Sequence, residues 1–196
     1  MIGSAQMLIG ALGLATLAAC RSGAPGPRGA SLFDAPVVMP TSKDGWRGSG
    51  TFHHHLSRAG NVFFAGQPDR AALDDASANN VTTIINTRTD PEIAPDRLGF
   101  DEPGVVRSLG LGYMPIPFAG DALGIEHADA LARALEGVPA DRCALIHCGS
   151  SNRVGALWAL YLARHRGVPV DEAIEHGRGA GLRSGELESR VRSLVR

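Results

Sequence analysis

The chain has 196 residues, of which 44% are hydrophobic and 20% are charged, and its formal net charge is −1. This composition is that of an ordinary globular protein and excludes a disordered or collagen-like chain. No basic run is present, so nothing favours binding to nucleic acid. Aromatic residues make up only 5% while Gly occurs 25 times, which suits an α/β protein with many turns better than a β-sandwich.

Residues 1–20 predict a lipoprotein signal peptide. The stretch 7–20, MLIGALGLATLAAC, is apolar apart from one Thr and is shorter than the about 20 residues that a transmembrane helix needs. Its length and small-residue end are typical of a signal-peptide core. The last four residues, LAAC, resemble the lipobox of bacterial lipoproteins, which implies that Cys20 is lipidated. The protein would then face the periplasm, anchored in the bacterial cell envelope.

The start of this leader, MIGSAQ, departs from the lipoprotein pattern because it has no Lys or Arg. An ordinary signal peptide and a buried apolar helix therefore stay open as alternatives. Residues 21–50 are rich in Gly, Pro and Ser without a sustained period, so we interpret them as a linker and irregular lead-in. The folded domain is expected over residues 51–196, which is long enough to bury a core.

Strands and helices are predicted to alternate along this domain. Short β-branched or aromatic runs bounded by turn residues predict strands, and amphipathic runs with Pro near the start or Gly near the end predict helices. The predicted strands cover 61–67, 81–89, 113–118 and 143–147. The predicted helices cover 68–80, 102–110, 125–138, 152–167 and two segments near the C-terminus, VDEAIEHGRGAG and GELESRVRSLVR.

This alternation predicts an α/β fold with a mostly parallel central sheet flanked by helices. The strand over 113–118 contains two Pro residues and should lie near an edge of the sheet. In such folds, ligands bind beyond the carboxyl ends of the strands. Cys148 lies one residue beyond such an end.

The stretch HCGSSNR, residues 147–153, places a Cys between a predicted strand and a predicted helix. The first N–H groups of a helix have no intrahelical partner, and the helix dipole puts partial positive charge there. The small residues of the loop allow its N–H groups to turn inward and bind an anion. Thiols in such settings ionise more readily than free Cys.

Arg153 adds a permanent cation whose planar fork of donors matches two oxygens of a tetrahedral anion. Without an anion, an Arg at a helix start is electrostatically unfavourable. A buried Cys after an apolar strand can also be a small core residue. The combination of Cys148 and Arg153 at this spacing favours a site that attacks a bound oxyanion.

HCGSSNR resembles the phosphate-binding loop of cysteine-dependent phosphatases, in which His-Cys and a short loop precede Arg. Four segments in matching order, AGQPDRAAL, TTIINTR, YMPIPF and HCGSSNRVGALWALY, together resemble the bacterial β-lactamase-hydrolase-like, phosphatase-like family. This family is related to the dual-specificity tyrosine phosphatases. The resemblance covers about residues 50 to 185 and implies a phosphotyrosine-phosphatase-like fold.

The resemblance implies that the chain hydrolyses phosphate monoesters of a protein, such as phosphotyrosine, or of a small molecule, without a cofactor or metal. Cys148 would be the nucleophile that forms a phosphocysteine, and Arg153 would bind the phosphoryl oxygens. His147 would order the loop and favour the thiolate, and it is counted with the loop among the substrate-binding residues. The loop residues Gly149, Ser150, Ser151 and Asn152 would supply backbone N–H groups to the substrate.

A phosphatase needs a general acid to protonate the leaving oxygen. In the enzymes that the chain resembles, this acid is an Asp on the loop after the strand that precedes the active-site strand. The segment FAGDALG stands at this position and offers Asp121. An Asp in a turn before a helix is also a common N-cap, so this alternative stays open.

Two features depart from the tyrosine-phosphatase pattern. Four residues separate Cys148 from Arg153, where five are usual, and four is the spacing of rhodanese sulfurtransferases. Ser151 also replaces a common Gly and would be strained if its φ were positive. The alternatives are therefore a sulfurtransferase with a persulfide on Cys148 and a non-catalytic, anion-binding envelope module.

Other polar residues have simpler interpretations. The run from His53 to His55 converges poorly on one metal ion because neighbouring side chains of an extended segment point to opposite faces. Arg88 is expected in a structural salt bridge, and Gln67 in a turn. Cys143 and Cys148 stand at opposite ends of one strand, about 16 Å apart, so no disulfide between them is expected.

Overall fold

The structure is a computed structural model that describes residues 30–42 and 45–196. Its centre is a six-stranded sheet with the order β1-β2-β3-β6-β4-β5. The strands β3, β6, β4 and β5 are parallel to one another, and the hairpin partner β2 and the short β1 continue the sheet antiparallel. Their bounds are β1 Thr41–Ser42, β2 Leu56–Ala59, β3 Val62–Ala65, β4 Val81–Asn86, β5 Gly112–Pro115 and β6 Cys143–His147.

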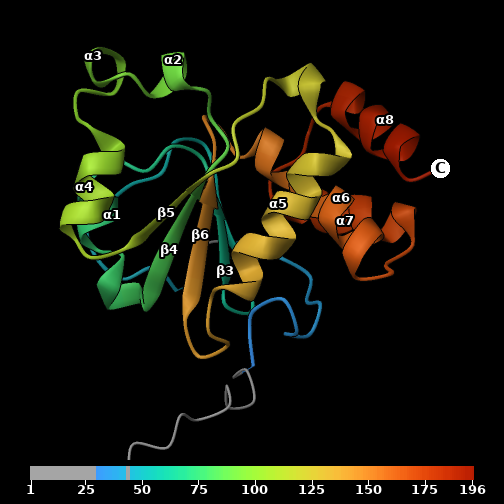
Figure 1. Ribbon diagram of the computed structural model, residues 1–196, viewed down its shortest axis with the longest axis horizontal. Coiled ribbons are helices and arrows are strands. Elements are labelled where there is room, and N and C mark those ends of the chain that lie inside the picture. The colour runs from blue at the N-terminus through green and yellow to red at the C-terminus, as the bar shows by residue number, and fades with distance from the viewer. Residues whose placement is uncertain (1–29, 43–44) are drawn as a thin grey trace, which may run out of the picture.

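Helices cover both faces of the sheet (Figure 1). On one face lie α1 Arg70–Asp74 and α4 Glu102–Ser108. On the other lie α5 Ile125–Glu136, α6 Asn152–His165, α7 Val170–Gly179 and α8 Gly185–Leu194. Four short segments complete the described chain: α2 Asp90–Ile93, α3 Pro95–Leu98 and the 3-10 turns η1 Ser77–Asn79 and η2 Gly120–Ala122. This arrangement confirms the predicted α/β fold.

Alternate residues of each central strand enter two separate cores. In β6, Ile146 packs among the helices α5 to α8, whereas Leu145 packs on the side of α1 and α4. All five residues of β6 are buried, because helices cover the sheet on both sides. The run CALIH, in which polar and apolar residues do not alternate, predicts such a strand buried on both faces.

The predicted strands and helices all appear, and the differences lie in short elements. The segment predicted as one helix over 68–80 is a five-residue α1 followed by η1, and it ends at Asn80 with a φ of +60°. The strand β5 forms the predicted edge of the sheet and ends at Pro115. The hairpin strand β2 was not predicted, nor were β1, α2, α3 and η2.

The folded unit begins upstream of residue 51, the expected start of the domain. Leu32 is buried in the larger core, and its N–H donates to the carbonyl of Val138 over 3.0 Å. Thr41 and Ser42 form β1 at the antiparallel edge of the sheet. Residues 30–42 of the expected linker therefore pack on the domain. The predicted signal peptide and Cys20 lie outside the described residues.

Within the described part of the chain, no helix is long and apolar enough to cross a membrane. Both described cysteines, Cys143 and Cys148, are free.

Candidate active site

Cys148 follows β6 at the carboxyl edge of the parallel strands. Its side chain is buried, and its N–H donates to the carbonyl of Ala65, the last residue of β3, over 3.3 Å. Four residues later the chain enters α6, a 14-residue helix with nine buried residues. The nucleophile expected from the sequence thus lies between the central strand and the most buried helix.

The loop turns sharply at Ser151, whose φ is +68°. This left-handed conformation is uncommon for a residue with a Cβ and is usually taken by Gly. The Ser151 side chain is buried, and its hydroxyl donates to the carbonyl of Ala180 over 2.7 Å. The loop therefore requires the positive φ that the sequence raised as a source of strain, and the hydroxyl ties the turn to the end of α7.

Several N–H groups of the loop are not used within the chain. Among the described residues, those of Gly149, Ser150, Asn152 and Arg153 donate no hydrogen bond that would tie the loop to itself or to its neighbours. The side chain of Asn152 points away from this set, because its Oδ1 accepts the N–H of Arg183 over 2.8 Å. The loop can therefore offer backbone donors to an anion, whereas the side chains of Ser151 and Asn152 serve to hold its shape.

Arg153 is held by a carboxylate that the sequence analysis did not identify. Its Nη1 donates to Oε2 of Glu92 over 2.8 Å, and its Nη2 donates to Oε1 over 2.6 Å. Burial alone would lower the pKa of Arg153, but the hydrogen bonds to Glu92 and the charge interaction with the nearby Cys148 raise it above its usual value. The same hydrogen bonds from Arg153 lower the pKa of Glu92 to about 2. Arg153 is thus a cation held at a fixed orientation beside Cys148.

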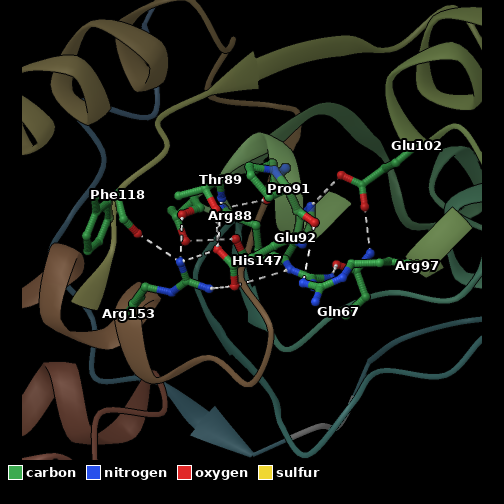
Figure 2. Close-up of polar contacts among 12 residues, drawn as sticks. Gln67, Arg88, Thr89, Pro91, Glu92, Arg97, Glu102, Phe118, His147 and Arg153 are labelled. Carbon is green, nitrogen blue, oxygen red and sulfur yellow. Dashed lines mark hydrogen bonds and ion pairs between the residues drawn. The ribbon is translucent and has the colours of Figure 1, made fainter. Parts of the chain in front are cut away.

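The guanidinium has one edge occupied and one edge free. Nη1 also donates to the carbonyl of Phe118 over 2.8 Å, and Figure 2 shows Arg153 between Glu92 and Phe118. Nε makes no hydrogen bond to another described residue, and Nη2 uses only one of its two hydrogens. Nε–H and the second Nη2–H lie side by side, which is the pair of donors that binds two oxygens of a tetrahedral anion.

Asp121, the expected general acid, lies in the exposed turn η2. It lines a cavity of about 470 Å³ together with Asn152 of the loop and with Glu186, Leu187 and Arg190 of α8. Cys148 and Arg153 do not line this cavity. The chain reaches η2 from Phe118, whose carbonyl contacts Arg153, so Asp121 belongs to the segment that borders the site.

His147 is fully buried and lies beneath the loop rather than at a surface that a substrate can reach. Its Nε2 is 3.1 Å from Oε1 of Glu102, the first residue of α4, which is also fully buried. Burial alone would raise the pKa of Glu102, but the positive charge of the nearby His147 and the hydrogen bonds from Gln67 and Tyr113 lower it to about 2. The structure thus pairs the residue that precedes Cys148 with a buried carboxylate.

The remaining polar candidates surround this pair. Gln67 donates to Glu102 over 2.6 Å and accepts from Nη1 of Arg88 over 2.6 Å. Arg88 lies 3.8 Å from Glu92, so it takes part in the expected salt bridge. Gln67, expected in a turn, lies in the connection between β3 and α1 and also links Glu102 to Arg88. In the part of the chain that the structure describes, the histidines at 53–55 belong to no cluster of three metal-binding side chains. His53 instead contacts Gln67 through backbone atoms.

Sequence reasoning missed Glu92 and Glu102 because each meets its partner only in the folded chain. Glu92 had one local signal: Thr89 stands three residues before it, a spacing typical of a helix start. Its carboxylate does accept hydrogen bonds from the N–H and the hydroxyl of Thr89, each 2.9 Å long. Nothing in the sequence near Glu102 indicates that it contacts His147.

No protein-family model matches the chain, and the curated proteins give no match either. Solved structures do match. TpbA from P. aeruginosa, in complex with phosphotyrosine, is 16% identical with a TM-score of 0.58, covering 81% of this chain and 94% of TpbA. A DUF442 protein from Shewanella putrefaciens CN-32 is 20% identical with a TM-score of 0.57, covering 73% and 91%. Kinase associated phosphatase, substituted at its catalytic site cysteine, is 15% identical with a TM-score of 0.58, covering 72% and 93%.

The chain has the fold of the cysteine-dependent, tyrosine-phosphatase-like phosphatases. In this fold, Cys148 lies between the end of the central strand β6 and the start of α6. The resemblance of HCGSSNR to a phosphate-binding loop implies a nucleophile at this position. At these identities the similarity establishes the fold, and the chemistry has to be argued from the residues of this chain.

Proposed function

We propose that the protein hydrolyses phosphate monoesters through a phosphocysteine on Cys148. The observation that carries this proposal is the pair of unused donors on Arg153 next to a loop with unused N–H groups. Donors of this kind can bind the three oxygens of a phosphoryl group carried by the Cys148 sulfur. Glu92 occupies the other edge of the guanidinium, so an anion need not displace it.

In the first step, the Cys148 thiolate attacks phosphorus and the bond between phosphorus and the leaving oxygen breaks. Asp121 donates its proton to that oxygen, so the product leaves as an alcohol or phenol. In the second step, water attacks phosphorus, Asp121 takes a proton from the water, and the P–S bond breaks. This restores the thiolate and releases phosphate. Arg153 and the loop N–H groups stabilise the charge in both steps.

Turnover of p-nitrophenyl phosphate and of a phosphotyrosine peptide tests the proposal. We expect turnover by the wild type and none by Cys148→Ser, because a hydroxyl at this position is a far weaker nucleophile. For Asp121→Asn we expect the rate to fall most with alkyl phosphates, whose leaving groups need a proton. If Cys148→Ser retained the wild-type rate, the mechanism would be wrong, and equal losses on aryl and alkyl phosphates would remove Asp121 from its role.

A sulfurtransferase remains the second candidate because four residues separate Cys148 from Arg153. In that reaction the thiolate takes the outer sulfur of thiosulfate, releases sulfite and carries a persulfide, which cyanide then removes as thiocyanate. Thiocyanate formation without phosphate release would make this the function. Binding of phosphate with neither turnover would favour a non-catalytic, anion-binding module.

The proposed substrate is a phosphorylated protein or small molecule. TpbA was solved with phosphotyrosine, which supports an aryl phosphate as the first substrate to test. We also propose that Cys20 carries the lipid and that the enzyme is anchored in the bacterial envelope facing the periplasm. Mass spectrometry of the native protein tests this, because an intact Met1 would contradict it.

A further inference from the structure

A chain of polar contacts joins the two ends of the nucleophile loop beneath the surface. From one end, His147 pairs with Glu102, Glu102 accepts a hydrogen bond from Gln67, and Gln67 accepts one from Arg88. Arg88 then lies 3.8 Å from Glu92, which holds Arg153 at the other end of the loop. The members lie on β6, α4, α2 and the segments after β3 and β4, so the network links separate elements of the fold.

The carboxylate of Glu102 is the buried centre of this network. Both Glu102 and His147 have no exposed side-chain surface. A buried carboxylate is costly unless a positive charge and hydrogen bonds compensate for it. His147 is the described group that can supply this charge by direct contact, since Arg88 reaches Glu102 only through Gln67.

We propose that Glu102 is a positioning residue for the reaction of Cys148, acting through His147. When His147 is protonated, the pair places the positive end of an ionic dipole at the residue that directly precedes Cys148. The backbone of His147 is fixed as well, because its carbonyl accepts hydrogen bonds from the N–H and the hydroxyl of Thr87 over 3.0 and 3.2 Å. Glu102 thus favours the thiolate and fixes the start of the loop.

Other ionisable groups face the pair from neighbouring elements and must be considered in any pH profile. Tyr113 on β5 donates to Glu102 over 3.2 Å, and burial with the nearby negative charge of Glu102 raises the pKa of Tyr113 well above its usual range. Arg88, after β4, faces Gln67. Because its pKa is raised so far, Tyr113 stays uncharged between pH 5 and 8 and does not contribute to a change in that range.

Glu102→Gln tests the proposal, because it keeps the shape of the side chain and removes its charge. The matched control is Glu126→Gln, since Glu126 also pairs with a His, at 3.2 Å, but is 72% exposed and lies on α5. Two measurements are made from pH 5 to 9: the alkylation rate of Cys148 by iodoacetamide, and kcat/KM with p-nitrophenyl phosphate. The alkylation rate can be measured even if the protein has no phosphatase activity. The proposal for Glu102 can therefore be contradicted separately from the proposed function.

We expect Glu102→Gln to shift the alkylation profile of Cys148 toward alkaline pH and to lower kcat/KM at pH 6 roughly tenfold to a hundredfold. Glu126→Gln should match the wild type in both. If Glu102→Gln does not fold, the double variant Glu102→Gln/His147→Gln leaves no unpaired buried charge and should show the same alkaline shift. A lower melting temperature with unchanged alkylation and kcat/KM profiles would make Glu102 purely structural and overturn the proposal.

Discussion

At the scale of single residues, Ser151 combines a strained backbone with a useful side chain. Its φ of +68° costs a residue with a Cβ about 1–2 kcal/mol, whereas its buried hydroxyl gains about 1 kcal/mol from the bond to Ala180. Ser151→Ala keeps the strain and loses the bond, so the free energy of unfolding should fall by about 1–2 kcal/mol. Ser151→Gly loses both and should stay within about 1 kcal/mol of the wild type.

Urea unfolding of the two Ser151 variants and the wild type measures these differences. The expected order of stability has the Gly variant above the Ala variant, the reverse of what is found at most positions in regular helices. An Ala variant more stable than the Gly variant would show that the positive φ costs the chain nothing.

A substitution of Glu92 tests whether the Arg153 guanidinium uses one edge to bind Glu92 and keeps the other edge for an anion. Glu92→Gln removes the charge that holds Arg153, while the free edge stays available. We therefore expect kcat/KM with p-nitrophenyl phosphate to fall roughly tenfold and inhibition by inorganic phosphate to weaken. The exposed Glu126→Gln is again the control. If phosphate inhibited Glu92→Gln more strongly than the wild type, Glu92 would be a competitor of the substrate, not its support.

The sequence alone pointed to Cys148 and Arg153 as candidates, because the end of the strand, the loop and the start of the helix are contiguous in the chain. It could not find Glu92 and Glu102, which come from segments 61 and 45 positions away from their partners. His147 shows the same limit. Sequence adjacency placed it with the substrate-binding residues, whereas the alternation of a strand turns its side chain away from that of Cys148 and into the protein.

At the scale of elements, long periodic segments were predictable and short ones were not. Helices α5 and α6 carry an apolar face over three or more turns, and β4 and β6 are compact apolar runs between turn residues. The strand β2 has only four residues, and its turn at Gly60 and Asn61, with a φ of +56° at Gly60, is a signal that the prediction overlooked. The four-residue helices α2 and α3 are too short to show a period.

The contact between α6 and α7 depends on two glycines. A Cβ on Gly155 would lie 2.4 Å from the carbonyl oxygen of Gly177 and from the N–H of Leu182, closer than atoms can approach. Gly155→Ala should therefore push the helices apart and lower the free energy of unfolding by about 1–3 kcal/mol, despite the better helix propensity of Ala.

Gly185→Ala is the matched control for that variant. Gly185 is the first residue of α8, and nothing lies within 4 Å of a Cβ placed there. We expect it to leave the melting temperature unchanged or slightly higher. Because α6 begins directly after the nucleophile loop, Gly155→Ala should also lower activity, and a variant with wild-type stability would show that the two helices can separate without cost.

At the scale of the molecule, the sheet separates the site from the point where the described chain begins. Cys148 lies at the carboxyl ends of the parallel strands, whereas the carbonyl of Ala30 accepts the N–H of Ala140, just before the amino end of β6. A lipid on Cys20, as proposed above, would then tether the domain by the end opposite to its nucleophile. Such a tether would favour substrates that approach from the aqueous side over lipids within the membrane proposed to hold the anchor.

The buried carboxylate also makes the stability of the whole domain depend on pH. The folded pKa of Glu102 is about 2, below its ordinary value of 4.5, so its contribution is present above about pH 5 and is lost as pH falls toward 2. The difference between the folded and the ordinary pKa corresponds to on the order of 3 kcal/mol of stability.

Glu102→Gln tests this dependence, because a Gln at this position cannot titrate. Its free energy of unfolding should fall less between pH 5 and pH 3 than that of the wild type. Urea unfolding followed by circular dichroism at both pH values measures this, with Glu126→Gln expected to keep the wild-type slope. Equal slopes for Glu102→Gln and the wild type would mean that Glu102 has the same pKa in the folded and the unfolded protein, so its contacts would not stabilise the carboxylate.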